Sequence, residues 1–170
     1  MEVFGRRGYR QGSLKDVADE VGLTVQGVLH HFPTKQRLLM ATLDHRTTVR
    51  SARMAAIRES DGVVAVMRYL LADNLANPGL MRLIVTVSAE ATDPDHPAHD
   101  YFVQRYRVVH DDLRSAFADE RARGRGPDLD PDAAASLLVA IADGLQLQRL
   151  LRPDLDLLAE FDSLTSSLVG

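Results

Sequence analysis

The stretch GLTVQGVLHHFPTK, which begins at Gly22, constrains the fold more than any other part of the chain. Before it, Ser13 can cap a short helix whose apolar residues recur every three or four positions. Gly22 suits the end of that helix because glycine readily takes a positive φ. Thr24 can cap a second short helix, which Pro33 must end, because a residue before proline is pushed out of the helical region. Two short helices joined by a turn in which Leu23 packs against both predict a helix-turn-helix.

The remaining chain is also expected to be helical. Alternating runs of β-branched residues are scarce, and no hairpin-turn signal lies between such runs. Clusters of glycine, proline and polar residues mark breaks at residues 61–62, 77–79, 92–98, 124–130 and 152–153. The expected longer helices cover residues 35–60, which Thr34 caps, 63–76, 79–91, 99–123, 131–151 and 154–169, and residues 2–7 look like the tail of an earlier helix. The sequence therefore predicts an all-α fold.

Composition excludes several classes of protein. With 45% hydrophobic and 26% charged residues, the 170-residue chain has a globular balance. It contains no cysteine, which excludes disulfides and thiolate metal sites. The segment MEVFGRRGYR has no signal-peptide core, and no uninterrupted apolar run approaches the roughly 20 residues of a membrane span. We therefore expect a soluble cytoplasmic protein.

Charge is distributed unevenly along the chain. Residues 1–53 hold nine Lys and Arg against five Asp and Glu, a net charge of +4. The remaining residues hold 11 basic against 19 acidic side chains, a net charge of −8. A basic head on an acidic body indicates an anionic partner for the head, although the net charge of the whole chain is −4.

Residues 13–46, SLKDVADEVGLTVQGVLHHFPTKQRLLMATLDHR, are similar to the DNA-binding segment of the TetR/AcrR family of bacterial transcriptional regulators. The similarity runs without a gap from about Tyr9 to Arg46, and its most specific part is the ending HHF-P-x-K-x-x-L. The later segments AEATDPDHPAH and PDLDPDAAASLLVAIADGLQLQRLL are similar to the ligand-binding and dimerising halves of many family members.

The resemblance implies an all-α fold in two domains, with a helix-turn-helix DNA-binding head over residues 1–46 and a helical effector-binding and dimerisation domain over residues 47–170. Family members carry most of a full helix before the position of Gly8, whereas seven residues precede it here, so a truncated first helix is expected. The implied function is a DNA-binding transcriptional repressor that a small-molecule effector releases from its operator. The implied partners are double-stranded operator DNA, an unidentified effector and a second copy of the chain, with no cofactor and no membrane.

The resemblance also assigns DNA contacts to the turn and the second helix of the motif. Gln26 is the best base reader, because a side-chain amide can bond adenine twice. Lys35 begins the next helix, where its ammonium and the backbone N–H groups can hold one phosphate, and a solvated surface lysine is the alternative. The expected DNA-binding residues are Tyr9, Thr24, Val25, Gln26, Gly27, His30, His31 and Lys35.

The two adjacent histidines are expected to face DNA or to pack on the helix. A metal site is not expected, because neighbouring helical residues point about 100° apart and metal-binding pairs favour a spacing of four. Two positions depart from the family pattern. Leu29 stands where an aromatic residue, usually Tyr, is common, which puts a phosphate contact in doubt. Gly27 replaces a commoner Ala or small hydroxyl residue and weakens the helix by up to roughly 1 kcal/mol.

Apolar residues at helical spacing in the body, with Tyr106 and His110 among them, are expected to line the effector pocket. For each of them a plain core role is the alternative. The expected ligand-binding residues are Met67, Leu71, Met81, Ile84, Val87, Phe102, Tyr106 and His110. In the family, two helices near the C-terminus pair with the same helices of a second protomer. For about half of the apolar residues on these helices, packing in the protomer's own core is the alternative. The expected dimer-interface residues are Leu137, Leu138, Ile141, Leu145, Gln148, Leu158, Phe161 and Leu164.

Other functions have weaker support in the sequence. One loop contains four polar residues, Asp93, Asp95, His96 and His99. We expect their side chains to be solvated, and a metal site is the alternative. No Gly-rich phosphate loop, H-E-x-x-H motif or nucleophile elbow is present, so neither an enzyme nor a catalytic residue is expected. The second hypothesis is a helical ligand-sensing dimer with a vestigial head, which the short first helix and Leu29 suggest.

Overall fold

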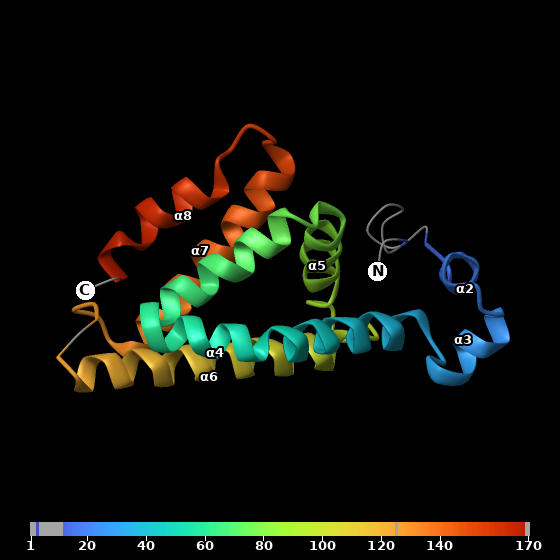
Figure 1. The fold of residues 1–170 in the computed structure, drawn as a ribbon, viewed down its shortest axis with the longest axis horizontal. Helices are drawn as coiled ribbons and strands as arrows, with labels where there is room; N and C mark the ends of the chain where they lie inside the picture. The colour runs from blue at the N-terminus through green and yellow to red at the C-terminus, as the bar shows by residue number, and fades with distance from the viewer. Residues whose placement is uncertain (1–2, 4–11, 125, 169–170) are drawn as a thin grey trace. The chain divides into compact units, whose positions relative to one another are not determined.

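The computed structural model describes residue 3 and residues 12–124 and 126–168, and within these ranges the regular structure is entirely helical (Figure 1). The predicted helix tail at residues 2–7 lies outside the described residues, apart from Val3. The all-α prediction is confirmed. The helices are α2 (Leu14–Val21), α3 (Val25–His31), α4 (Lys35–Leu75), α5 (Pro78–Glu90), α6 (His99–Ala122), α7 (Pro131–Leu151) and α8 (Leu157–Thr165), followed by the 3-10 helix η1 (Ser166–Leu168).

Local capping chemistry accounts for several of these helix ends. α7 has the predicted bounds, and the Asp130 carboxylate accepts a hydrogen bond from the backbone N–H of Asp132 at 2.9 Å. The last helix starts at Leu157 and not at residue 154, because the Asp156 carboxylate caps it by accepting from the N–H of Ala159 at 3.1 Å. A polar side chain at such a position satisfies a backbone donor that has no partner within the helix.

The predicted break at residues 61–62 is a kink within α4. Gly62 has φ 84° and ψ −177°, which is far from helical geometry, while helical structure continues on both sides. A Cβ atom at this position would lie 3.0 Å from Oε1 of Glu120. Glycine therefore permits both the positive φ and the close approach of that carboxylate. The helices predicted over residues 35–60 and 63–76 are therefore the two arms of one bent helix.

The chain forms two compact units. The first unit lies within residues 1–52 and 77–101, and the second within residues 53–76 and 102–170. The helix-turn-helix and α5 belong to the first unit, and α7 and α8 belong to the second, while α4 and α6 contribute to both. The predicted domain boundary at residue 46 concerns function and stays a prediction.

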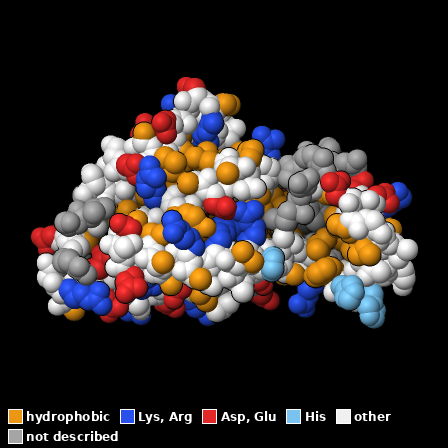
Figure 2. Space-filling view, viewed as in Figure 1, with side chains coloured by type: hydrophobic (Ala, Val, Ile, Leu, Met, Phe, Trp, Pro, Cys, Tyr) orange, Lys and Arg blue, Asp and Glu red, His pale blue; other side chains and the backbone are white. Residues whose placement is uncertain are grey.

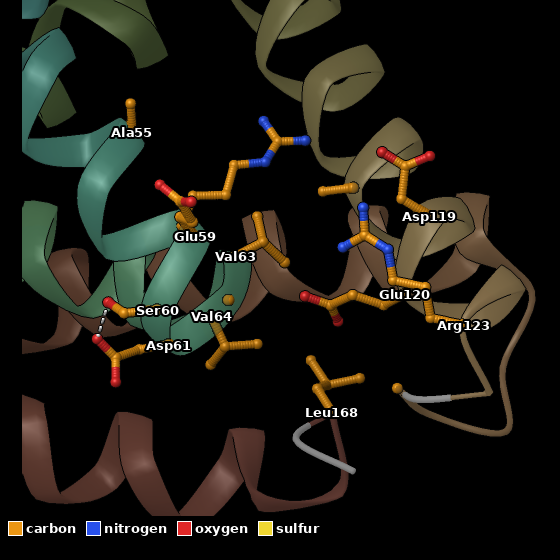
Figure 3. Close-up of a pocket in the computed structure, with 14 residues that line it drawn as sticks. Ala55, Glu59, Ser60, Asp61, Val63, Val64, Asp119, Glu120, Arg123 and Leu168 are labelled. Atoms are coloured by element: carbon orange, nitrogen blue, oxygen red, sulfur yellow. Dashed lines mark hydrogen bonds between the residues drawn. The ribbon is translucent and has the colours of Figure 1, made fainter.

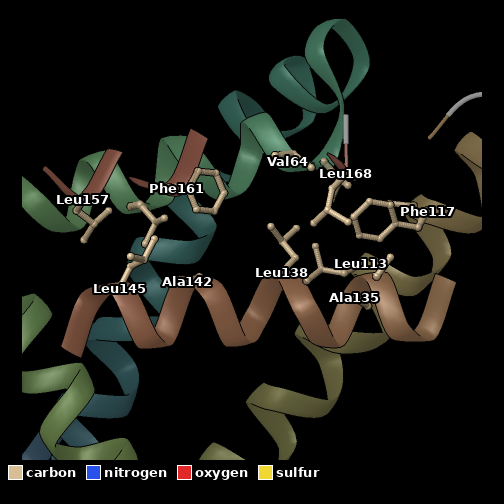
Figure 4. Packing of buried hydrophobic residues seen from close by; sticks show 14 of the residues in the cluster. Val64, Leu113, Phe117, Ala135, Leu138, Ala142, Leu145, Leu157, Phe161 and Leu168 are labelled. Carbon is tan, nitrogen blue, oxygen red and sulfur yellow. The ribbon is translucent and has the colours of Figure 1, made fainter. Parts of the chain in front are cut away.

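The second unit has a continuous apolar core between α4, α6, α7 and α8 (Figure 4). Leu145 of α7 points toward Leu157 of α8, and the fully buried Leu138 and Phe161 lie further along the same two helices. Outside this core, Arg68 of α4 and Asp162 of α8 form a two-pronged ion pair, with nitrogen–oxygen distances of 2.7 and 3.0 Å. These contacts hold α8 against both α4 and α7.

The first unit buries side chains from four helices. Ala18 of α2 and Val28 of α3 are buried, as are Leu39 and Leu43 of α4. From α5 the unit buries Leu80, Met81, Leu83 and Val87. The Tyr101 hydroxyl donates to the carboxylate of Asp44 at 2.9 Å, which ties the start of α6 to α4.

Among the described helices, α7 is long and apolar enough by length and composition alone to cross a membrane. Its sequence is not an uninterrupted apolar run, because polar residues such as Asp143 and Gln146 lie within it. Six of its side chains, including Gln146, are buried in the second unit. Its place in that core explains part of its apolar character, and the rest comes from exposed residues that include Leu137, Leu147 and Leu151.

Candidate DNA-binding site and effector pocket

The helix-turn-helix is built by local hydrogen bonds that the sequence predicts. Ser13 and Asp16 form a capping box, in which the Ser13 hydroxyl accepts from the N–H of Asp16 at 3.1 Å and the Asp16 carboxylate accepts from the N–H of Ser13 at 2.9 Å. Gly22 ends α2 in the left-handed region at φ 68°, where a Cβ atom would meet nothing within 4 Å. The Thr24 hydroxyl then caps α3 by accepting from the N–H of Gly27 at 3.0 Å.

The packing role predicted for Leu23 is wrong. Its side chain is 56% exposed, whereas Ala18 of α2 and Val28 of α3 are buried. The turn is closed by the backbone, because the N–H of Leu23 donates to the carbonyl of Ala18 at 2.9 Å. Small side chains at the helix contact, together with this bond, leave Leu23 at the surface.

The first turn of α3 presents exposed side chains. Thr24, Val25 and Gln26 are all exposed, although Val25 is apolar, with 37% of its surface accessible. Gly27 is half-buried, and a Cβ atom there would lie 3.3 Å from the Thr24 hydroxyl oxygen. Three of the four residues predicted to face base edges, Thr24, Val25 and Gln26, are therefore accessible in this structure, and their contacts with DNA stay a prediction.

His30 and His31 are exposed at the end of α3, where Figure 2 shows histidine side chains standing at the surface. Their rings pack edge to face, with centroids 5.2 Å apart and planes inclined at 74°. The second ring also approaches Phe32 at 6.5 Å. The two imidazoles therefore contact each other in the last turn of α3.

Lys35 is the first residue of α4 and is half-buried. Burial lowers the pKa of its ammonium from the ordinary lysine value. The preceding Thr34 accepts a hydrogen bond from the N–H of Arg37 at 3.1 Å, which agrees with the predicted cap. Tyr9, the remaining predicted DNA contact, lies outside the described residues.

The eight predicted ligand-binding residues fall in both units. Met81, Ile84 and Val87 belong to the first, and the other five belong to the second. Most are buried or half-buried, and Leu71 is part of the apolar core of the second unit, with Met67 packed against it. Leu71 therefore has the core-packing role that was the alternative to ligand binding.

The two polar members of that set contact α7. The Tyr106 hydroxyl donates to the carboxylate of Asp143 at 2.7 Å. Nε2 of His110 lies 3.1 Å from the Ser136 hydroxyl and 3.8 Å from the carboxylate of Asp132. Both side chains thus connect α6 to α7.

A second polar link, which the sequence reasoning missed, joins α4 to α7. Nδ2 of Asn74 donates to Oε1 of Gln146 at 2.8 Å, and Nε2 of Gln146 donates to the carbonyl of Ala142 at 3.1 Å. Gln146 is buried, so this pairing satisfies polar atoms that would otherwise destabilise the core. Its only sequence signal is a glutamine within an apolar helix.

A cavity of about 490 Å³ lies beside the kink at Gly62 (Figure 3). The carboxylates of Glu59 and Asp61 belong to its α4 side, and those of Asp119 and Glu120 to its α6 side. None of the eight predicted ligand-binding residues lines it. In this region the sequence predicted a helix break and no pocket. The full lining is Ala55, Arg58, Glu59, Ser60, Asp61, Gly62, Val63, Val64, Ala116, Asp119, Glu120, Arg123, Gly126 and Leu168.

The predicted dimer-interface residues divide into three groups, which are buried, half-buried and exposed. Leu138, Leu145 and Phe161 are buried in the core of their own protomer, so their assignment to an interface is corrected to internal packing. Ile141 and Leu158 pack partly against that core, while Gln148 is exposed. Leu137 and Leu164 are 40% and 49% exposed. Leu147 and Leu151 of α7, which were not among the predicted residues, are also exposed.

The loop before α6 uses its polar side chains on its own backbone. The Asp93 carboxylate accepts from the N–H of Asp95 at 3.0 Å, and Nδ1 of His96 accepts from the N–H of Ala98 at 3.2 Å. Nδ1 of His99 lies 2.9 Å from the carbonyl of Ala91. These bonds shape the loop in the way expected of Asx turns.

A helix-turn-helix with an exposed second helix, followed by a separate helical unit, defines a helix-turn-helix DNA-binding protein. Residues 1–42 match the family model of bacterial regulatory proteins of the tetR family. Residues 60–162 match the model of the C-terminal part of BetI-type transcriptional repressors. The chain belongs to the TetR family of bacterial transcriptional regulators.

Individual relatives agree with this membership. The HTH-type transcriptional regulator TtgR of Pseudomonas putida is 30% identical over 94% of this chain and 81% of its own length. Two solved structures share the fold over 99% of this chain and 93% of theirs. They are a TetR transcription regulator from Haloarcula marismortui, with a TM-score of 0.82 and 21% identity, and the regulator FadR from Bacillus subtilis in complex with stearoyl-CoA, with a TM-score of 0.81 and 15% identity.

Proposed function

We propose that this TetR-family regulator is a repressor that binds operator DNA as a homodimer and leaves it when a small-molecule effector binds. The observation that carries the proposal is the exposed first turn of α3 within a capped helix-turn-helix. The match of residues 60–162 to BetI-type repressors supports repression. A head that has lost DNA recognition is not favoured, because residues 1–42 match the family's DNA-binding segment.

In this proposal α3 enters the major groove and its first turn reads base edges. Gln26 pairs with adenine, its amide nitrogen donating to N7 and its oxygen accepting from the N6 amino group. Thr24 and His30 contact phosphates on either side of the groove. Lys35 and the backbone N–H groups that open α4 hold another phosphate. The exposure of Thr24, Gln26 and His30 supports these roles.

The effector has two candidate locations. The first is the set of eight residues predicted from the sequence, whose Met and aromatic members suit an apolar ligand. The second is the cavity beside Gly62, which is favoured because its volume of about 490 Å³ lies in the range typical of small-molecule sites, about 300–1,000 Å³. α4 contributes to both units, so an effector that changes the bend of α4 would alter how the two heads of a dimer fit successive major grooves.

The relatives do not identify the effector. FadR of Bacillus subtilis was solved with stearoyl-CoA, but at 15% identity this likeness concerns the fold alone. We also infer that the protein acts in the cytoplasm, as DNA-binding regulators of this family do.

The test is a salt-titrated binding measurement with fluorescently labelled duplex from the region upstream of the protein's own gene. The native chain should bind saturably, and its affinity should fall steeply between 50 and 200 mM salt as counterions return to the phosphates, by about 10³–10⁵-fold for six to ten phosphate contacts. Lys35→Gln should weaken binding to all duplexes and reduce the salt slope by about 1, because one phosphate is no longer neutralised. Gln26→Ala should instead relax sequence preference, at a cost of about 1–3 kcal/mol on the preferred site.

Arg121→Gln is the matched control for charge. Arg121 is exposed at the end of α6 in the second unit, and its replacement changes the net charge as Lys35→Gln does. This variant should keep the native affinity and salt slope. Equal effects of Lys35→Gln and Arg121→Gln would show that Lys35 makes no phosphate contact, and absence of binding to any duplex at low salt would refute the proposed function.

A further inference from the structure

We infer that the head recognises A·T base pairs, with the exposed side chain of Val25 packing on the 5-methyl group of a thymine while Gln26 bonds a neighbouring adenine. This inference rests on the proposed function and specifies the bases that the site reads. It starts from an apolar side chain that the fold leaves exposed at the place where a recognition helix meets base edges.

The position of Val25 matters more than its exposure, because single exposed apolar residues are common on protein surfaces. It is the first residue of α3, and the helix is capped immediately before it by the bond from the Gly27 N–H to the Thr24 hydroxyl. A β-branched side chain has few rotamers, so its two methyl groups are held ready at little cost in entropy. Among the base edges of the major groove, the methyl of thymine is the apolar partner for such a side chain.

The composition of α3 restricts the alternatives. Its seven residues are VQGVLHH, which include no Arg or Lys to pair with guanine and no Asp or Glu to pair with cytosine. The only other polar side chains on this helix, His30 and His31, lie roughly 7–9 Å further along the axis at 1.5 Å per residue. In the first turn the reading groups are therefore the Gln26 amide and the Val25 methyl groups.

The residues next to Val25 and Gln26 add no large polar side chain to the first turn. Gly27 places no side chain in the first turn, and a Cβ atom there would crowd the Thr24 hydroxyl at 3.3 Å. Leu23, which precedes Thr24 in the sequence, is a second exposed apolar residue. The apolar side chain of Val25 is complementary to a thymine methyl group, and the Gln26 amide beside it is complementary to the edge of an adenine.

The experiment selects duplexes from a random-sequence library with the full native chain, and then replaces each thymine of the selected half-site by uracil. This change removes the 5-methyl group and keeps the base pairing. One thymine adjacent to an adenine should prove sensitive, with affinity falling about fourfold, which is the effect of exposing one buried methyl group. For Val25→Ala, which removes the two γ-methyl groups, the ratio of the thymine and uracil affinities should be smaller than for the native chain.

Val25→Ala should fold normally, because it replaces an exposed β-branched residue by the best helix former. The control is Val21→Ala, at a residue that is 57% exposed at the end of α2 and outside the recognition helix. This variant should keep the native ratio between thymine and uracil duplexes.

Two results would overturn the inference and leave the proposed function intact. One is a selected half-site whose α3-dependent positions are G·C pairs. The other is a Val25→Ala protein that still distinguishes thymine from uracil as the native chain does. Failure to select any duplex at low salt would overturn both the proposed function and this inference.

Discussion

At the scale of single residues, the helix-turn-helix depends on two helix-capping hydroxyl groups and on one glycine with a positive φ. The Ser13 and Thr24 hydroxyls each accept a bond from a backbone N–H that has no partner in its helix. Gly22 takes the left-handed conformation that reverses the chain between α2 and α3. Because these needs are local, each can be tested by a conservative replacement.

Gly22→Ala is expected to destabilise the protein by about 1–2 kcal/mol, which is the cost of placing an L-residue in the left-handed region. Nothing lies within 4 Å of a Cβ atom at this position, so steric crowding adds nothing. Urea unfolding followed by circular dichroism measures the change. Gly22→Asn should lose less, because asparagine tolerates this conformation. Equal losses for the two variants would mean that the cost does not arise from the backbone angle.

At the scale of elements, the links between helices are polar as well as apolar. α6 and α7 are joined by the Tyr106 hydroxyl, which donates to the carboxylate of Asp143. Desolvation raises the pKa of the Asp143 carboxyl, although the Tyr106 hydrogen bond and the charge of Arg105 oppose part of the rise. The folded state therefore holds this proton more tightly than the unfolded state.

Such a raised carboxyl pKa makes stability fall as pH increases. The loss begins at the ordinary pKa of an unfolded aspartate and is complete above the raised pKa of the folded protein. Asp143→Asn removes the charge and keeps an acceptor for Tyr106, so it should be more stable than the native chain at pH 7. The advantage should shrink as the pH is lowered toward 4, as measured by urea unfolding midpoints.

Tyr106→Phe is the counterpart of that variant. Without the hydroxyl, the Asp143 carboxylate loses a hydrogen bond that favours its charged form, so this protein should be less stable than the native chain at pH 7. If Asp143→Asn destabilises the protein equally at pH 7 and pH 4, the carboxyl does not titrate in this window.

At the scale of the whole molecule, the proposed regulator needs two heads, and hence a surface through which two copies meet. The late helices present exposed apolar side chains, among them Leu137 and Leu151 of α7 and Leu164 of α8. Side chains of the same helices that were predicted at the interface, such as Leu138 and Phe161, are used internally. We therefore place the dimer seam on the exposed subset.

Leu137→Asp combined with Leu164→Asp should weaken the dimer by tenfold or more, because two charges would be buried in an apolar interface. Circular dichroism should remain native, since both side chains are 40% or more exposed in the protomer. Sedimentation velocity measures the dissociation. Val103→Asp, on the exposed surface of α6, is the control and should dimerise normally. If the double variant dimerised as the native chain does, the dimer interface would not include Leu137 and Leu164.

The sequence by itself determined several of the helix ends and the position of the break in α4, although it placed the start of the last helix three residues too early. α7 has the predicted bounds, Gly22 ends α2, and Asp61-Gly62 interrupts α4, because caps and breaks depend on residues within about four positions. The helix-turn-helix and the family followed from the same local pattern, whereas the assigned DNA contacts, the effector contacts and the seam stay predictions.

Only the tertiary structure decided which apolar residues became core. Leu137 and Leu138 are chemically identical neighbours, yet one is exposed and the other fully buried, since burial depends on the helices that pack from elsewhere in the chain. The same reason explains the exposed Leu23, the cavity beside Gly62 and the Asn74–Gln146 pair, whose members lie 72 residues apart. A periodic pattern identifies the apolar face of a helix, but the packing of the other helices determines how much of that face is covered.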